Sequence, residues 1–271
     1  MSTSGQVDKT PHGIWAATLE QLVTYSYLGC HSVLGEGYNA VGEMVLRSDM
    51  RHGGGLTGAP AAIAMLDAAG NAIDRHWQLA LTHIDVHLGR PASDVRRLGI
   101  IGSMTHSARS QKFTECMFTD ADNPDSVVGL GTADWTVMSD TLPGFVYVDP
   151  GPGVEDTGDL PPLSSAYGAV PRDGGGFVIP EMTLALGYKA LHHGPILVNL
   201  EAAALQVAGP NCRVETFSAR IVKGGKQGPF TATATVLSDV DDVIMVRADL
   251  ADDGAGHLVA TAVERLRRFS G

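Results

Sequence analysis

The two halves of this 271-residue chain carry the same succession of signals, and this repeat is the strongest constraint on the fold. Each half has a glycine turn with a proline, Gly58-Ala59-Pro60 and Gly194-Pro195, before an alanine-rich apolar segment. Within that segment, Leu66-Asp67-Ala68-Ala69 in the first half matches Leu200-Glu201-Ala202-Ala203 in the second. A long strand, a loop and further alternating strands follow in both halves. Self-similarity of this kind predicts one supersecondary unit used twice.

The segment 61–73 predicts a buried helix in the first half, because it is apolar, alanine-rich and free of β-branched runs, and the apolar segment 196–208 predicts the corresponding helix in the second half. Apolar residues at helical spacing predict a further helix over 14–27, ended by Gly29. Strands are predicted where apolar and polar residues alternate. These segments are 33–50, 79–88, 98–108, 112–120 and 127–138 in the first half, and 174–186, 214–222, 230–239, 242–252 and 256–268 in the second.

A stretch rich in Pro, Gly and Asp separates the two halves, which is a linker composition. We therefore expect an N-terminal lead and helix (1–28), a first unit (29–138), a linker (139–173) and a second unit (174–271). Whether the linker also covers a site stays open at this point.

Composition excludes several classes of protein. A formal net charge of −11 argues against a general nucleic-acid binder, which needs a basic face. No apolar run reaches the ~20 residues of a membrane span, and the polar N-terminus does not resemble a secretory signal. Three widely spaced cysteines predict reduced thiols rather than disulfides. We expect a cytoplasmic protein without nucleic-acid or membrane partners.

The order of elements resembles the hotdog fold, an α+β architecture. RHGGG (51–55) and LHHGP (191–195) resemble the His-Gly turn that opens the central helix of hotdog thioesterases of the phenylacetyl-CoA type. Asp67 and Glu201 resemble the carboxylate that this family carries on the same helix, and LVATAVERL (258–266) resembles its last strand. The resemblance spans residues 30–138 and 170–268. It implies a double hotdog, with two antiparallel sheets in tandem, each wrapped round a central helix.

The same resemblance implies an acyl-CoA thioesterase that hydrolyses an acyl or aroyl thioester. Coenzyme A would be part of the substrate, with no metal or redox cofactor. In hotdog dimers the helix carboxylate faces the turn of the other unit, so each site would be composite. A helix N-terminus supplies unpaired N–H groups and the positive end of the helix dipole, and a glycine there lets the thioester oxygen approach. The carboxylate would act as a general base on water or as a nucleophile.

Glu201 is the better candidate acid, because it is the only charged residue of its apolar helix and burying a carboxylate is costly unless it is paired or used. It follows His193 by eight positions, whereas Asp67 follows His52 by 15, so the functional turn of the first half stays open. For either acid the alternative is a structural role, facing solvent or capping a neighbouring backbone. The candidate catalytic residues are Glu201, Asp67, His193 and His52, and the candidate substrate-binding residues are Gly54, Gly55, Gly58, Gly194, Asn199, Arg220 and Lys223.

Arg220 and Lys223 lie on a predicted strand and its following loop, where basic groups could hold the phosphates of coenzyme A. The alternatives are a solvated charged rim for these two and a structural amide for Asn199. The histidines lack the spacing of metal ligands, so no metal site is predicted.

Two other functions remain open. Asp49 and His52 are three residues apart, and hotdog hydratases and dehydratases use an Asp and a His near the helix start. A non-catalytic double hotdog that binds acyl ligands is the other alternative. The acyl group and the number of chains in a possible homo-oligomer stay undetermined.

Overall fold

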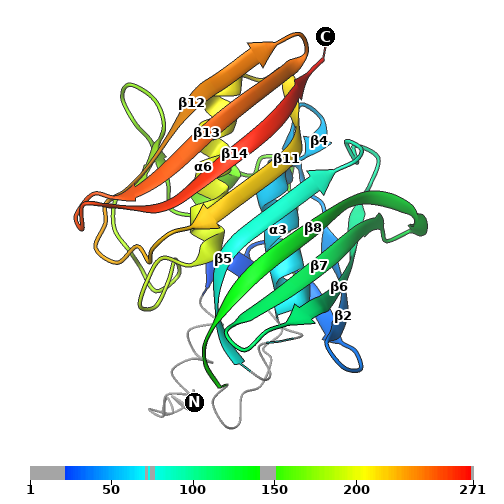
Figure 1. The fold of residues 1–271 in the computed structure, drawn as a ribbon. Coiled ribbons are helices and arrows are strands. Elements are labelled where there is room, and N and C mark those ends of the chain that lie inside the picture. The colour runs from blue at the N-terminus through cyan, green and yellow to red at the C-terminus, as the bar shows by residue number, and fades with distance from the viewer. Residues whose placement is uncertain (1–21, 71–72, 74–76, 141–150, 270–271) are drawn as a thin grey trace, which may run out of the picture.

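A single antiparallel sheet of twelve strands runs through both halves of the chain in the computed structural model, which describes residues 22–70, 73, 77–140 and 151–269. The strand order is β1-β2-β6-β7-β8-β5-β11-β14-β13-β12-β10-β9. Figure 1 shows this sheet as a curved surface with the helices α3 and α6 behind it, both on the same face.

The first half contributes six strands and the second half another six. They are β1 (His31–Leu34), β2 (Asn39–Val45), β5 (Trp77–Leu88), β6 (Arg97–Ser107), β7 (Gln111–Asp120) and β8 (Asn123–Asp140), then β9 (Val170–Pro171), β10 (Phe177–Ile179), β11 (Cys212–Ile221), β12 (Phe230–Val240), β13 (Val243–Asp252) and β14 (His257–Arg268). A separate two-stranded hairpin, β3 (Arg51–His52) with β4 (Gly55–Leu56), follows the 3₁₀ turn η1 (Ser48–Met50) and precedes α3.

Each half has one principal helix. In the first half, α3 (Gly58–Met65) continues as the π-helical turn η2 (Leu66–Gly70), and in the second half α6 spans His193–Ala208. Every residue of α3 and η2 is buried. Small residues allow this close packing: a Cβ on Gly102 of β6 would lie 2.9 Å from the backbone nitrogen of Ala69. The alanine content of the helix is thus matched by glycine in the sheet.

The two halves have the same order of elements. Neighbouring strands follow the order β2-β6-β7-β8-β5 in the first half and β10-β12-β13-β14-β11 in the second. Along the chain, α3 lies between β2 and β5, and α6 lies between β10 and β11. The halves meet where β5 pairs with β11, from His87 opposite Thr216 to His83 opposite Arg220. The two sheets expected from the sequence are therefore joined edge to edge into one.

Four boundaries differ from the sequence-based expectation. The segment 33–50 is two strands and a 3₁₀ turn rather than one strand. Of 174–186 only β10 is a strand, because Pro180 has no N–H to donate to the ladder. The linker 139–173 contains the short helix α5 (Leu163–Ala166) and β9, while β8 extends to Asp140. Of the helix expected at 14–27, residues 14–21 lie outside the described residues, and α2 covers Val23–Ser26.

The core lies between the sheet and the helices. Phe118 on β7, Phe217 on β11 and Phe230 on β12 are fully buried there. Within the residues described, no helix has both the length and the apolar character needed to cross a membrane.

Candidate functional site

The carboxylate of Glu201, on α6 of the second half, binds the N-terminal end of α3 in the first half. Its Oε1 accepts the backbone N–H of Gly58 at 2.5 Å, and its Oε2 accepts that of Ala59 at 3.0 Å. Only 3% of Glu201 is exposed. A helix N-terminus has N–H groups without intrahelical partners, and its dipole favours a negative charge. Glu201 thus completes the first turn of a helix more than a hundred residues away in the sequence.

Burial raises the pKa of Glu201 to about 7, against the hydrogen bonds from Ala59 and Gly58 that favour the charged form. Both protonation states are therefore populated near neutral pH. A general base is most effective when its pKa lies near the operating pH.

Glycine at position 58 is required by this packing. A Cβ there would lie 2.4 Å from the Cβ of Phe217 and 3.1 Å from Oε1 of Glu201. The preceding residue, Thr57, is the N-cap of α3, and its hydroxyl donates to the carbonyl of Met50 at 3.1 Å. The chain therefore enters α3 with the Gly58 amide pointing at the acid.

Glu201 lines a cavity of about 270 Å³. Its apolar wall comes from α6, β10 and the segment around α5, and its polar groups come mostly from the turn before α3. The apolar residues are Pro162, Leu163, Phe177, Val198, Ala202 and Leu205, and the polar ones are Asp49, Arg51, His52, Thr57, Ser164 and Glu201. An apolar wall with a few convergent polar groups is typical of a small-molecule site. Residues of the expected linker thus help to form this cavity.

Three polar residues beside Glu201 in this cavity are held by other groups. His52 contacts the carbonyl of Gly209 through Nε2 at 3.0 Å. Asp49 accepts two hydrogen bonds from Arg47, at 3.0 and 3.1 Å. Arg51 donates to the carbonyls of residues 92 and 95. These contacts fix the walls of the cavity around the acid.

The three glycines proposed for the first-half turn lie in different surroundings. Gly54 is exposed at the tip of the β3–β4 hairpin with a φ of +75°, and nothing lies within 4 Å of a Cβ built there. Gly55 packs beside Pro91 and Arg213. Only the amide of Gly58, among the three, is bonded to Glu201. Of the three amides expected to bind a thioester oxygen, that of Gly58 is thus occupied by the acid itself.

The corresponding turn of the second half is covered by α2. Thr24 Oγ1 is hydrogen-bonded to His192 Nδ1 at 2.8 Å, and the Tyr25 hydroxyl to His193 Nε2 at 3.1 Å. A Cβ on Gly194 would lie 2.4 Å from Thr24 Oγ1. Burial lowers the pKa of His192 to about 4, and burial together with His192 lowers the pKa of His193 well below its usual range. His193 is thus a neutral ring beside tyrosine, and it does not line the cavity that contains Glu201.

The other predicted acid, Asp67, lies in η2 and is 2% exposed. Its charge contributes to the raised pKa of the buried Cys30 thiol. Asp67 does not line the cavity that contains Glu201. The two helix acids therefore occupy different environments despite their matching sequence positions.

The remaining predicted substrate-binding residues do not line this cavity either. The buried Asn199 donates from Nδ2 to the carbonyl of Pro195 at 2.7 Å, inside its own helix. Arg220 is exposed on β11, next to the inward-facing Ala219, and Lys223 is exposed in the following loop. Because neighbouring strand residues point to opposite faces, Arg220 lies on the face of the sheet away from Glu201.

Sequence reasoning missed three residues of this region: two in the apolar wall of the cavity and one buried acid. Phe177 and Leu163 line the cavity from β10 and α5, and no motif marks them. Glu264, on β14, is fully buried. A signal for Glu264 was available, because the alternation of its strand places it on the same face as Ala262 and Leu266.

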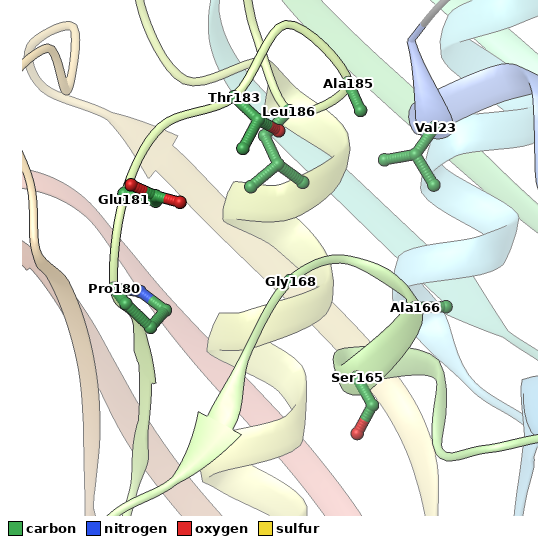
Figure 2. Close-up of a pocket in the computed structure, with 9 residues that line it drawn as sticks. All are labelled: Val23, Ser165, Ala166, Gly168, Pro180, Glu181, Thr183, Ala185 and Leu186. Carbon is green, nitrogen blue, oxygen red and sulfur yellow. The ribbon is translucent and has the colours of Figure 1, made fainter.

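A second cavity of about 350 Å³ borders α5 and is lined by none of the residues around Glu201 (Figure 2). It is bordered by Val23 of α2, by Ser165 and Ala166 of α5, and by the segment 180–186. Its one titratable group is Glu181. It offers space next to α2 but no cluster of reactive groups.

Sequence comparison with protein-family models and with curated proteins gives no match. Solved structures do match. They include a hotdog-fold protein of unknown function from Alicyclobacillus acidocaldarius (15% identity, TM-score 0.62, 92% of this chain and 98% of that one). An acyl-ACP thioesterase from Bacteroides thetaiotaomicron has 12% identity, a TM-score of 0.58, and coverage of 86% and 99%.

Acyl-CoA thioesterase II TesB2 from Mycobacterium marinum has 13% identity, a TM-score of 0.56, and coverage of 92% and 98%. At these identities the comparison establishes the hotdog fold and leaves the activity to be argued from the site.

Proposed function

We propose that this protein is an acyl-thioester hydrolase built as a tandem pair of hotdog units, with one composite site at Glu201 and Gly58. The observation that carries the proposal is the buried Glu201 carboxylate, which lies at the amide end of the other half's helix and in the wall of a cavity. The equal strand order of the two halves and the thioesterase names among the structural neighbours support it.

The chemistry requires the amide of Gly58 to change partner. When an acyl thioester enters the cavity, its carbonyl oxygen takes the Gly58 N–H in place of Oε1, and the dipole of α3 stabilises the negative charge that develops there. The released carboxylate oxygen of Glu201 then takes a proton from water as the water oxygen bonds to the thioester carbon. The C–S bond breaks next, and the thiolate takes the proton back from Glu201. Water and thioester thus yield a carboxylic acid and a thiol.

The hydratase alternative is less well supported by the geometry. Asp49 and His52 do line the same cavity, but both oxygens of Asp49 are held by Arg47 and His52 is bonded to a main-chain carbonyl. Taking up a proton would weaken the ion pair of Asp49 with Arg47, whereas donation from Nε2 to the carbonyl leaves Nδ1 of His52 as a possible base. The hydratase alternative therefore depends on His52 alone, without a paired acid.

Release of free thiol from a panel of acyl-CoA, aroyl-CoA and acyl-ACP thioesters tests the proposal. We expect turnover of at least one class and its loss in Glu201→Gln. Turnover that persists in this variant would overturn the assignment of Glu201. Thermal stabilisation by thioesters without any turnover would support the acyl-binding alternative, and hydration of an enoyl-CoA would support the hydratase.

A further inference from the structure

A second carboxyl group lies beneath Glu201, and the catalytic scheme above does not use it. Glu264 of β14 is fully buried, and neither of its carboxyl oxygens has a hydrogen-bond partner among the described residues. Leaving a buried polar group without a hydrogen bond is unfavourable, so such a group requires an explanation.

The sheet register places Glu264 next to the site. Its Cα partner on β11 is Phe217. In an antiparallel pair, side chains of opposite residues leave the sheet on the same face. Phe217 packs against Gly58, at the position where Glu201 Oε1 also lies. Glu264 therefore points from the sheet toward the contact between α3 and α6.

The groups around Glu264 leave Glu201 as its charged neighbour. On the inward face of β11 the titratable group is Cys212, and burial raises the pKa of its thiol. The partner on β13, Val246, is apolar, and α3 carries no titratable side chain. Burial and the negative charge of Glu201 raise the pKa of Glu264 well above its usual range. Two carboxylates in one buried site do not both ionise near neutral pH.

We propose that Glu264 is a positioning residue, which stays protonated and directs its O–H toward the Glu201 carboxylate, so that the pair carries a single negative charge in the active enzyme. This inference rests on the proposed function, since it assigns Glu264 a role in setting the ionisation of the base. A neutral donor next to Glu201 favours its charged form, whereas a second carboxylate there would suppress it.

Two variants of similar volume separate this role from a structural one. Glu264→Gln keeps a neutral group with N–H donors, and we expect kcat within about threefold of the wild type and the same acidic limb of the pH–rate profile. Glu264→Leu removes the donor. We expect a fall in kcat of about tenfold or more and an acidic limb displaced to higher pH.

The stability of Glu264→Leu should not fall with its kcat. Glu264 points toward Glu201 but makes no hydrogen bond to it among the described residues, so Leu at this position leaves no bonded partner unsatisfied. Glu264→Leu is therefore expected to unfold at the same or higher urea concentration than the wild type. A variant that is as stable but slower is not explained by a structural role. Unchanged kcat and pH profile in Glu264→Leu would overturn the proposal, as would equal losses in both variants.

A ¹³C NMR titration of the carboxyl groups measures how the ionisation of Glu201 depends on Glu264, and it does not require turnover. The wild type should show two strongly shifted carboxyl groups, and Glu264→Gln only that of Glu201. If no thioester is hydrolysed but this coupling is seen, the proposed function fails and the carboxyl pair stands. If hydrolysis is seen but Glu264 titrates in the ordinary range, the pair fails and the hydrolase stands.

Discussion

Glu201 accepts the amide hydrogen of Gly58 at 2.5 Å, across 143 positions of sequence. This bond connects the principal helices of the two halves at the point where the chain needs glycine. It also makes the site composite, since the acid and the amide come from different halves. The contact has a structural effect, capping α3, and in our proposal a catalytic one, since the same amide serves the substrate.

Replacing Glu201 by Gln should abolish most thioesterase activity while keeping the fold. Gln retains the volume but is no base, and loss of a general base lowers rates by about 10²–10⁴. The measurement is kcat on the best thioester of the panel, together with circular dichroism to verify folding. Asp67→Asn is the matched control, because Asp67 lies at the equivalent position of the other helix but outside the cavity. We expect it to retain activity within about threefold, and a loss as large as that of Glu201→Gln would indicate a second working site.

The pH dependence of kcat/KM should follow the ionisation of Glu201. Because its pKa is raised to about 7, the base is mostly protonated at pH 5 and mostly ionised at pH 8. Activity should therefore rise with an apparent pKa near 7 and then level off. A profile that is flat from pH 5 to 8 would argue that Glu201 is not the group that titrates.

Much of the architecture could be predicted from the sequence, because hydrophobic periodicity and glycine turns are local signals. The alanine-rich helices and the meander strands in each half lie where the pattern predicts them, within a few residues. Glu201 was recognisable as a single charge in an apolar helix, since such a residue needs a partner when it is buried.

The partner itself could not be read from the sequence. Three candidate glycines, Gly54, Gly55 and Gly58, lie before or at the start of the first helix. Only the packing of Phe217 and Glu201 against Gly58 selects one of them. The two glycine turns also differ for a tertiary reason. Gly58 meets Glu201, whereas Gly194 is covered by Thr24 of α2, which lies far away in sequence. Such contacts depend on tertiary packing, to which local patterns are insensitive.

Stability should depend on pH through the same carboxyl group. The folded-state pKa of Glu201, about 7, exceeds the ordinary value of 4.5, so between these pH values the folded protein binds more protons than the unfolded chain. Stability is then full below about pH 4.5 and falls as pH rises through 7, by up to about 3 kcal/mol for this group. Urea unfolding from pH 5 to 8 should show a steeper decline for the wild type than for Glu201→Gln. Equal declines would show that Glu201 does not titrate in this range.

Gly58→Ala should damage stability and activity together. The added Cβ would lie 2.4 Å from the Cβ of Phe217, so α3 or β11 has to shift, at a cost of about 1–3 kcal/mol. The shift also moves the amide away from Glu201. Gly89→Ala is the control, since the nearest atom to its Cβ lies at an ordinary 3.7 Å. Urea unfolding and kcat of both variants provide the test, and a Gly58→Ala protein with wild-type values of each would contradict the packing described here.

The preference for acyl-chain length should depend on Phe177. This residue of β10 forms part of the apolar wall of the cavity. Truncation to Ala enlarges the cavity beside Glu201 without touching a polar group, so longer acyl chains gain contacts that the wild type excludes. One methylene in an apolar pocket changes kcat/KM by roughly tenfold or more, and we expect a shift of about this size in the ratio of long to short acyl-thioester substrates. Val178→Ala is the matched control, because the neighbouring strand residue points to the other face and does not line the cavity. An unchanged ratio in Phe177→Ala, or an equal shift in the control, would place the acyl chain somewhere other than this cavity.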